Sequence, residues 1–407
     1  MLTYLKSFFN AKEIPDDIRL MTTATGIRWF GWGFAEALIP VLIFSFGNSF
    51  AEAGLIKASV DITFIMALPI IGMFADKIKS TTLIAIGLCL YLLVGFSYFM
   101  VGVTGMVIFI VIARLINGLS WGLDVVGRET YFRRHVNKKR VATAFGYFDT
   151  VADFWWIASA VMGIFLVRYF SITTLLFLIT PTSFISLLII LKLRKKEKKI
   201  QVVKEEKSSI NPLKEISDWS LMLKSIGCFN FLIAFAASVV AFFLPIETYK
   251  EGGSLTMVIL IGIVSTLPTL SGWSLGKFFD AKGYKMLGTS LVTFSLLLMA
   301  LSFLTSFWWR MVIMFIISLT LELISVGSNE LITASAKPQH FGRVDGIMKS
   351  FASIGGMIGP FFVGILIDKT NMANAYISLA IVIFSLAVIF KTLDKRGFIE
   401  KYVVSGR

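Results

Sequence analysis

The sequence predicts an all-α integral membrane protein with twelve transmembrane helices in two pseudo-symmetric six-helix bundles. First, 56% of its 407 residues are apolar and only 16% are charged, which is not the composition of a soluble protein with a hydrated surface. Second, the apolar residues gather in stretches close to the roughly 20 residues that a helix needs to cross the hydrocarbon. Third, the two halves of the chain resemble each other in sequence.

The apolar stretches account for all twelve expected helices. In chain order they cover residues 22-45, 53-75, 82-101, 105-127, 142-167, 171-191, 219-245, 255-279, 286-307, 310-332, 342-367 and 372-391. The fourth and fifth stretches contain more charge than the others, so hydropathy alone supports them less strongly. A membrane β-barrel is excluded because the stretches are too long and lack alternation with a period of two residues.

The repeat appears when the sequence is shifted by 200 residues. Val126 and Gly127 then fall on Val326 and Gly327, and Gly146 falls on Gly346. The halves are separated by a hydrophilic segment, and the predicted organisation is an N-terminal bundle (1-191), a linker (192-218) and a C-terminal bundle (219-407). Parallel repeats of this kind are typical of alternating-access carriers.

The distribution of basic residues predicts the orientation. The net charge is +14, and 30 of the 39 Lys and Arg residues fall in segments on one side of the predicted spans, against 4 in the loops of the other side. The positive-inside rule places the richer side, and with it both termini, in the cytoplasm. We therefore expect a multi-pass protein of the cell inner membrane and no binding of nucleic acid. The N-terminal residues lack the features of a cleavable signal peptide, so the first span is expected to be retained.

Two loop segments carry a family resemblance. After the second span, Gly72-x-x-Ala75-Asp76-Lys77-x-Lys79 resembles the loop motif of the major facilitator superfamily, although Ile78 replaces the usual Gly. A second copy, Gly276-x-x-x-Asp280-x-Lys282-Gly283-x-Lys285, follows the eighth span. In the fourth span, Arg114-x-x-Asn117-Gly118-x-x-x-Gly122 is similar to another motif of the family. Gly355-x-x-x-Gly359-Pro360 in the eleventh span resembles a motif that drug antiporters of the family carry in helix 5, where this chain has Ser159 and Ala160.

The resemblance implies that two bundles rock about a central site lined by helices 1, 4, 7 and 10. The loop motif would form a latch that closes and opens with this movement, through an Asp followed by Lys residues. An ordinary loop with inside-positive charge is the alternative interpretation. The candidate latch residues are Gly72, Asp76, Lys77, Glu129, Arg133, Gly276, Asp280 and Lys282, and the pair Asp124 and Arg128 is expected to assist Asp76.

Polar residues inside the predicted spans are the candidates for substrate binding and proton coupling, because charges in hydrocarbon cost free energy and usually face an aqueous cavity. They are Arg28, Trp32, Glu36, Arg114, Asn117, Trp121, Asp149, Asp153, Asn230, Glu322 and Lys349.

Glu36 is the candidate with a predicted partner. In the first span Arg28, Trp32, Glu36 and Pro40 follow at four-residue steps and would form one stripe on a continuous helix. Family geometry would let Glu36 face Arg114, and such a carboxylate can exchange its partner for a proton or a cation. A static pair that only packs two helices is the alternative.

Two further acidic candidates lie on other spans. Asp149 and Asp153 share a face of the fifth span, and their mutual repulsion favours a proton on one of them; salt bridges from Asp153 to Arg114 or Lys349 are the alternative. Glu322, in the tenth span, would otherwise bond to Ser318 or Ser325 on its own face.

Nothing in the sequence indicates an enzyme, a cofactor or a metal site: the two histidines, His135 and His340, have no partner at ligand spacing, and no nucleotide-binding loop occurs. The predicted protein is a monomeric secondary transporter that lies in the lipid bilayer. Its predicted function is to export a lipophilic or cationic small molecule, with protons as the coupling ion. Proton symport of a sugar or other nutrient is the first alternative. A lipid flippase, or a receptor on the same fold, is the second.

Overall fold

The structure, a computed structural model, describes residues 14–47, 49–75, 77–135, 141–197, 219–271, 285–335 and 341–395. All elements assigned within these ranges are helices. Among them, ten helical segments are long and apolar enough to cross a membrane, and two shorter apolar helices, Leu255–Leu270 and Met286–Leu301, bring the number to twelve. The prediction of an all-α fold with twelve membrane helices is therefore confirmed.

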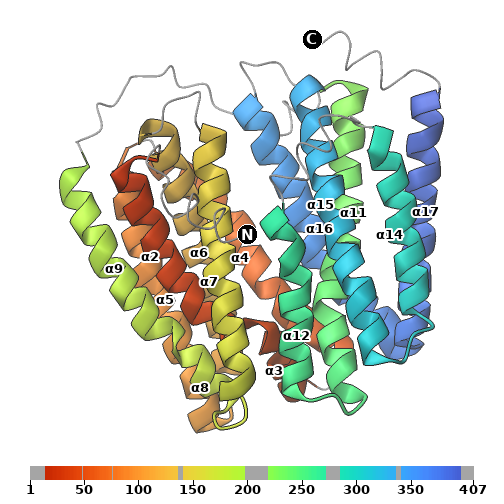
Figure 1. Cartoon of the computed structure of the whole chain (residues 1–407), viewed down its shortest axis with the longest axis horizontal. Coiled ribbons are helices and arrows are strands. Elements are labelled where there is room, and N and C mark those ends of the chain that lie inside the picture. The colour runs from red at the N-terminus through yellow and green to blue at the C-terminus, as the bar shows by residue number, and fades with distance from the viewer. Residues whose placement is uncertain are drawn as a thin grey trace, which may run out of the picture. The chain divides into compact units, whose positions relative to one another are not determined.

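The chain forms two compact units (Figure 1): Met1–Ile39 with Ile62–Lys204, and Pro40–Asp61 with Glu205–Arg407. The first unit contains α2 (Asp16–Gly33), η1 (Glu36–Leu38), the later part of α4 (Phe50–Ala75), α5 (Ser80–Thr104), α6 (Ile108–His135), α7 (Val141–Leu166), α8 (Ile172–Phe177) and α9 (Ile179–Lys196). The second contains most of α3 (Ile39–Phe46), the earlier part of α4, α11 (Leu221–Lys250), α12 (Leu255–Thr266), η3 (Leu267–Ser271), α14 (Lys285–Leu301), α15 (Phe307–Ser335), α16 (Phe341–Lys369) and α17 (Met372–Lys395). These units group residues that lie close together in space. The expected N-terminal bundle (1-191) and C-terminal bundle (219-407) were instead divided by the sequence repeat, and this division stays a prediction.

In the first unit, a carboxylate from α9 begins α5. Glu197, just past the end of α9, accepts hydrogen bonds from the backbone N–H groups of Ser80 and Thr81, each at 3.1 Å. A negative side chain on the first N–H groups of a helix satisfies otherwise unpaired donors and complements the helix dipole. The sequence analysis placed Glu197 in the linker, but the structure uses it to join two helices. At its other end, α5 stops at Gly105, whose φ of +68° suits glycine.

In the second unit, glycines of α16 lie against the backbone of α11. A Cβ atom added to Gly355 would stand 2.2 Å from the carbonyl oxygen of Phe231, and one added to Gly359 would stand 2.7 Å from that of Phe235. Both distances are too short for any side chain. The glycines noticed in the sequence as a motif are therefore explained by close packing of two helices.

The same helix also packs against the start of α4 in the second unit. A Cβ on Gly54 would lie 2.5 Å from the carbonyl oxygen of Pro360, and a Cβ on Gly364 would lie 2.6 Å from that of Phe50. The carboxylate of Asp368 accepts hydrogen bonds from the backbone N–H groups of Phe50 and the next residue, both at 2.9 Å. The N-terminus of α4 is thus held by an acidic side chain from α16.

One turn further along α4, Lys57 makes an ion pair with Asp61 of the same helix. Its Nζ lies 2.6 Å from Asp61 Oδ2 and donates a second bond, also 2.6 Å long, to the carbonyl oxygen of Gly356. The pair is therefore structural, and it adds a polar contact between α4 and α16.

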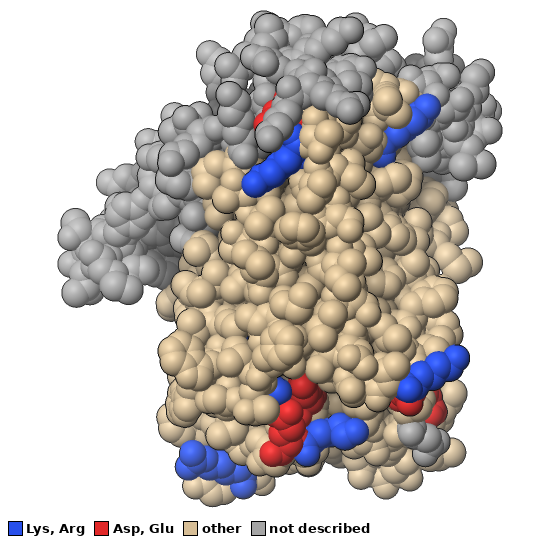
Figure 2. All heavy atoms as spheres, turned by 90° about the vertical axis from the view of Figure 1, so that its right-hand side faces the viewer, with Lys and Arg blue, Asp and Glu red and all other residues tan. Residues whose placement is uncertain are grey.

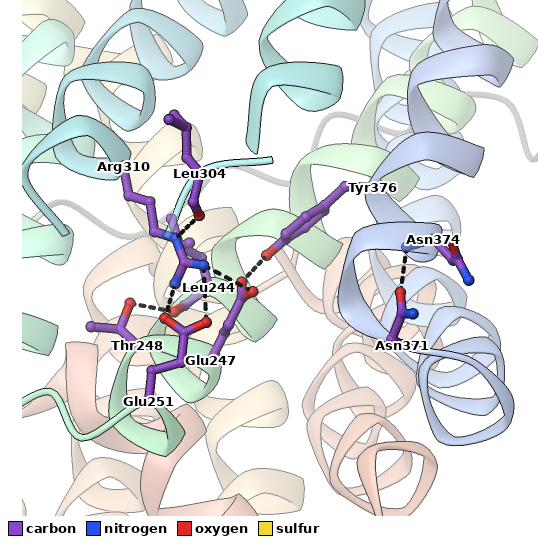
Figure 3. Close-up of polar contacts among 9 residues, drawn as sticks. All are labelled: Leu244, Glu247, Thr248, Glu251, Leu304, Arg310, Asn371, Asn374 and Tyr376. Carbon is purple, nitrogen blue, oxygen red and sulfur yellow. Dashed lines mark hydrogen bonds and ion pairs between the residues drawn. The ribbon is translucent and has the colours of Figure 1, made fainter. Parts of the chain in front are cut away.

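A buried arginine connects three helices at the same end of the second unit (Figure 3). Arg310, which is 4% exposed, binds Glu251 through both terminal nitrogens and Glu247 Oε1 at 3.2 Å. Its Nε donates to the carbonyl oxygen of Leu304 at 2.7 Å, and Tyr376 donates to Glu247 Oε2 at 3.1 Å. The cluster joins α11, α15 and α17.

We expect Gly355→Ala to destabilise the protein, because its methyl group would overlap a backbone carbonyl that cannot move without displacing α11. The expected loss in free energy of unfolding is about 1–3 kcal/mol, measured by urea unfolding of the purified protein in mild detergent. The neighbouring Gly356→Ala is the matched control, since a Cβ there meets only Ser238 Cβ, at 3.9 Å. Equal losses in the two variants would contradict the packing argument.

Candidate substrate and coupling site

The candidate site in the first unit is built around an interruption of the first membrane span. Helix α2 ends at Gly33, and Ala35 leaves helical geometry with φ −147° and ψ 6° before η1 begins at Glu36. The first span is therefore not one continuous helix, and Arg28, Trp32, Glu36 and Pro40 do not follow one another on a single helical face. Interrupted helices at membrane depth are a recurring element of transporter sites.

Close packing against α7 accompanies the interruption. A Cβ on Gly33 would lie 2.3 Å from the carbonyl oxygen of Trp156, and a Cβ on Gly163 would lie 2.3 Å from that of Phe34. Glycine on each side therefore lets the two backbones touch where the first span leaves helical geometry. This fixes Glu36 next to the middle of α7.

Glu36 accepts a hydrogen bond from the indole of Trp156. The distance from Trp156 Nε1 to Glu36 Oε2 is 2.6 Å, and the indole is buried, with 7% of its surface exposed. Arg114 and Arg28 also act on the carboxylate through their charges. Arg114 thus acts on Glu36 through its charge, while the direct hydrogen-bond donor to Glu36 is Trp156 of α7.

Arg114 lies on α6 beside a buried tyrosine of α5. The charges of Arg114 and Glu36 both act on the Tyr98 hydroxyl. Within the described ranges, this hydroxyl and Arg114 Nε are buried atoms that lack a hydrogen bond of ordinary geometry. The side chains of Arg114 and Tyr98 lie close enough to interact with each other directly, which joins α6 to α5.

A second buried cluster contains Arg28, Asp124 and Arg128. Asp124 Oδ2 lies 2.8 Å from Arg28 Nη2 and 2.9 Å from Arg128 Nη2, and the Asp124 side chain is 1% exposed. The Arg28 guanidinium lies 4.6 Å from the ring centre of Tyr91, and that of Arg128 lies 4.4 Å from that of Phe148. Each of the two cations thus also lies against an aromatic ring.

Asp124 and Arg128 form an ion pair at four-residue spacing on α6. Asp124 also binds Arg28 of α2, a partner that the sequence did not predict. Only the position of α2 against α6 brings these two residues together. The role of Asp124 and Arg128 beside Asp76 stays a prediction, because Asp76 lies outside the described residues.

The remaining candidates of the first unit lie on the same helices. Asp149 on α7 is exposed and Asp153 is half-buried, and the charges of Arg128, Asp153 and Glu129 act on Asp149. The expected influence of the two aspartates on each other is therefore present.

Two tryptophans and an asparagine complete this group. Trp32 is buried edge-on against Tyr91 with ring centres 6.0 Å apart, and Trp121 stacks on Phe64 at 4.2 Å while 38% of its surface stays exposed. Asn117 is half-buried on α6. Trp121 thus presents an aromatic face at the surface of the unit.

Three candidates belong to the second unit. Asn230 on α11 accepts a hydrogen bond from Ser328 of α15 at 2.7 Å. Glu322 is half-buried on α15, and Lys349 is exposed on α16. The asparagine joins two helices that the family resemblance expects to line the cavity.

The predicted latch is described only in part. Asp76, Gly276, Asp280 and Lys282 lie outside the described residues, as does the side chain of Arg133. Lys77 is exposed and Glu129 is half-buried. Among the described residues, a Cβ on Gly72 would meet nothing within 4 Å, and the latch itself stays a prediction.

We expect Asp124→Asn to destabilise the protein strongly, because it would remove the buried carboxylate that Arg28 and Arg128 share. A loss of about 3–5 kcal/mol in the free energy of unfolding is expected, measured by urea unfolding in detergent. Asp149→Asn removes an exposed carboxylate and is expected to change this free energy by less than about 1 kcal/mol. Similar losses in both variants would mean that the buried cluster has no special weight.

Comparison with known proteins gives consistent similarities. The family model for the Major Facilitator Superfamily matches residues 21–287 and 283–398. The quinolone resistance protein NorA of Staphylococcus aureus strain COL is 21% identical over 381 residues, which cover 92% of this chain and 95% of that protein. Among solved structures, the nucleoside transporter NupG matches with a TM-score of 0.77 and 13% identity, covering 94% of this chain and 100% of that chain. A bacterial homolog of the human lysosomal transporter Spinster matches with a TM-score of 0.68 and 13% identity, covering 96% and 97%.

Proposed function

We propose that this chain, which belongs to the Major Facilitator Superfamily and is a multi-pass membrane transporter, exports a lipophilic or cationic small molecule in exchange for protons. The observation that carries the proposal is Glu36, a carboxylate placed at the interruption of a membrane span and held by Trp156 at 2.6 Å. A carboxylate at this depth is costly while charged. A proton or a cationic substrate that neutralises it relieves this cost, and competition between the two couples their movements.

The surroundings of Glu36 support an exchange of partners. Trp156 is a neutral donor, so the hydrogen bond to one carboxylate oxygen persists while the other oxygen gains or loses a proton. Arg114 and Arg28 act on the charged form and compensate part of its charge when neither proton nor cation is present. Asp149 and Asp153 of α7, which act on each other and lie near Arg128, form a second place for the proton.

Export is favoured over nutrient uptake by two observations. The relatives that match along nearly their whole length are named as quinolone resistance proteins. The polar residues of the first-unit site are accompanied by the aromatic groups Trp32, Trp121 and Trp156 rather than by many amides and hydroxyls, which suits a flat lipophilic molecule. We place the monomeric protein in the plasma membrane with both termini in the cytoplasm.

The test uses everted membrane vesicles with an acidic interior and a fluorescent pH probe. An exporter that exchanges protons dissipates the gradient when ethidium or norfloxacin is added outside, whereas a proton symporter for nutrients does not respond in this direction. We expect Glu36→Gln to lower this dissipation to the level of vesicles without the protein, because the amide cannot carry the proton. Glu36→Asp is expected to retain part of it.

Asp16→Asn, which changes an exposed acid at the start of the same span, is the control and is expected to behave as the unchanged protein. If the gradient responds equally in Glu36→Gln and the unchanged protein, Glu36 is not the coupling residue. If no compound of a broad panel dissipates the gradient, proton-coupled export is wrong.

A further inference from the structure

The second unit contains an apolar pocket that the proposed transport function does not use. It has a volume of about 440 Å³ and lies between α11, α14, α15 and α17. This is within the roughly 300–1,000 Å³ of small-molecule sites. All its lining residues fall between Leu221 and Leu393, so the pocket belongs wholly to the second unit.

Most of the apolar wall of the pocket comes from two of these four helices. Leu386, Phe390 and Leu393 recur at the spacing of one helical face of α17, and Phe229 and Leu232 line the opposite side from α11. Leu287 of α14 also takes part. The cavity is therefore suited to a hydrocarbon chain and offers little to a polar solute.

The mouth of the pocket is apolar and open to the surface. Leu221 and Ile389 both line it, and they are 63% and 57% exposed. The face of the molecule drawn in Figure 2 carries a broad uncharged band between charged residues above and below, as expected of a surface that meets lipid. Large exposed aliphatic side chains at the mouth of a cavity in a membrane protein indicate access from the acyl chains of the bilayer.

Two lysines lie at the same end of this pocket. Lys224, exposed on the first turn of α11, is one of its lining residues. Lys391 is exposed on α17, and its aliphatic chain passes within 3.2 Å of a Cβ position on Gly288, beside the lining residue Leu287. Asp394 lies one turn further on and is half-buried, so the three charges sum to +1. This end faces the cytoplasm in the predicted topology.

We infer that the pocket binds the acyl chain of an anionic phospholipid whose phosphate lies between Lys224 and Lys391. An apolar cavity open to the bilayer with cations at its cytoplasmic end matches such a lipid in both parts, because basic pockets between membrane helices on that side bind anionic headgroups. A neutral lipid would fill the cavity without using the lysines. A transported compound would bind in a site open to water, whereas this pocket opens toward the acyl chains of the bilayer and belongs to one unit alone.

A cysteine inside the pocket makes occupancy measurable. Cys228 is exposed and lines the pocket, and the chain has two cysteines, so Cys89→Ser leaves Cys228 alone. We expect N-ethylmaleimide to label this protein more slowly in vesicles that contain dioleoyl-phosphatidylglycerol than in vesicles of dioleoyl-phosphatidylcholine alone. The acyl chains are the same, so the difference reports the headgroup. In the Lys224→Gln/Lys391→Gln double variant this preference is expected to fall by roughly fivefold for each lysine.

The matched control is Lys250→Gln/Lys369→Gln, which removes the same charge from exposed positions at the opposite ends of α11 and α16 and is expected to keep the preference. Glycerol phosphate added to phosphatidylcholine vesicles is expected to leave labelling unchanged, since the apolar chain is required. Equal labelling in both lipids, or an unaltered preference in the Lys224/Lys391 variant, would overturn the inference. Neither result bears on the proposed export, because the test changes no residue of the first-unit site.

Discussion

The main chains of α2 and α7 touch where the first span is interrupted, and the candidate site depends on this contact. Gly33 and Gly163 carry no side chain, so the carbonyl oxygens of Trp156 and Phe34 occupy the space where a Cβ would stand. The backbone at Ala35 leaves helical geometry at the same place. Glu36 is consequently held beside Trp156 by packing of main chain on main chain, which is less compliant than contact between side chains.

The charges buried in the first unit form two neighbouring groups with different chemistry. Around Asp124, one carboxylate is shared by two guanidinium groups, each of which also lies against an aromatic ring, an arrangement that stabilises a fixed ionic state. Around Glu36, one carboxylate has a neutral donor and cations that act on it through their charges. The group around Asp124 suits a structural role, and the group around Glu36 suits a change of protonation. The two arginines of the first group therefore place a fixed positive charge near a carboxylate that can gain or lose a proton.

The second unit uses its charges near the ends of its helices. Arg310 gathers two glutamates and a backbone carbonyl where α11, α15 and α17 meet, and Asp368 holds the N-terminus of α4. Its interior carries instead an apolar pocket with lysines at one end. The halves of the chain share a sequence repeat, yet the buried ion pairs of the first unit have no counterpart among those described in the second, and the functional assignments differ accordingly.

The sequence by itself determined the number, type and approximate limits of the membrane helices and identified Arg28, Glu36 and Arg114 as candidates, and its motifs pointed to the family. These properties are sums over neighbouring residues: hydropathy over about 20 residues decides whether a helix can cross the bilayer, whatever it packs against. The tertiary structure alone decided the interruption at Ala35 and the partners of the buried charges, Trp156 for Glu36 and Asp124 for Arg28. The partners of these charges depend on how whole helices rotate and approach one another. Glycine contacts between segments that are distant in the sequence determine this packing, and no local sequence pattern predicts those contacts.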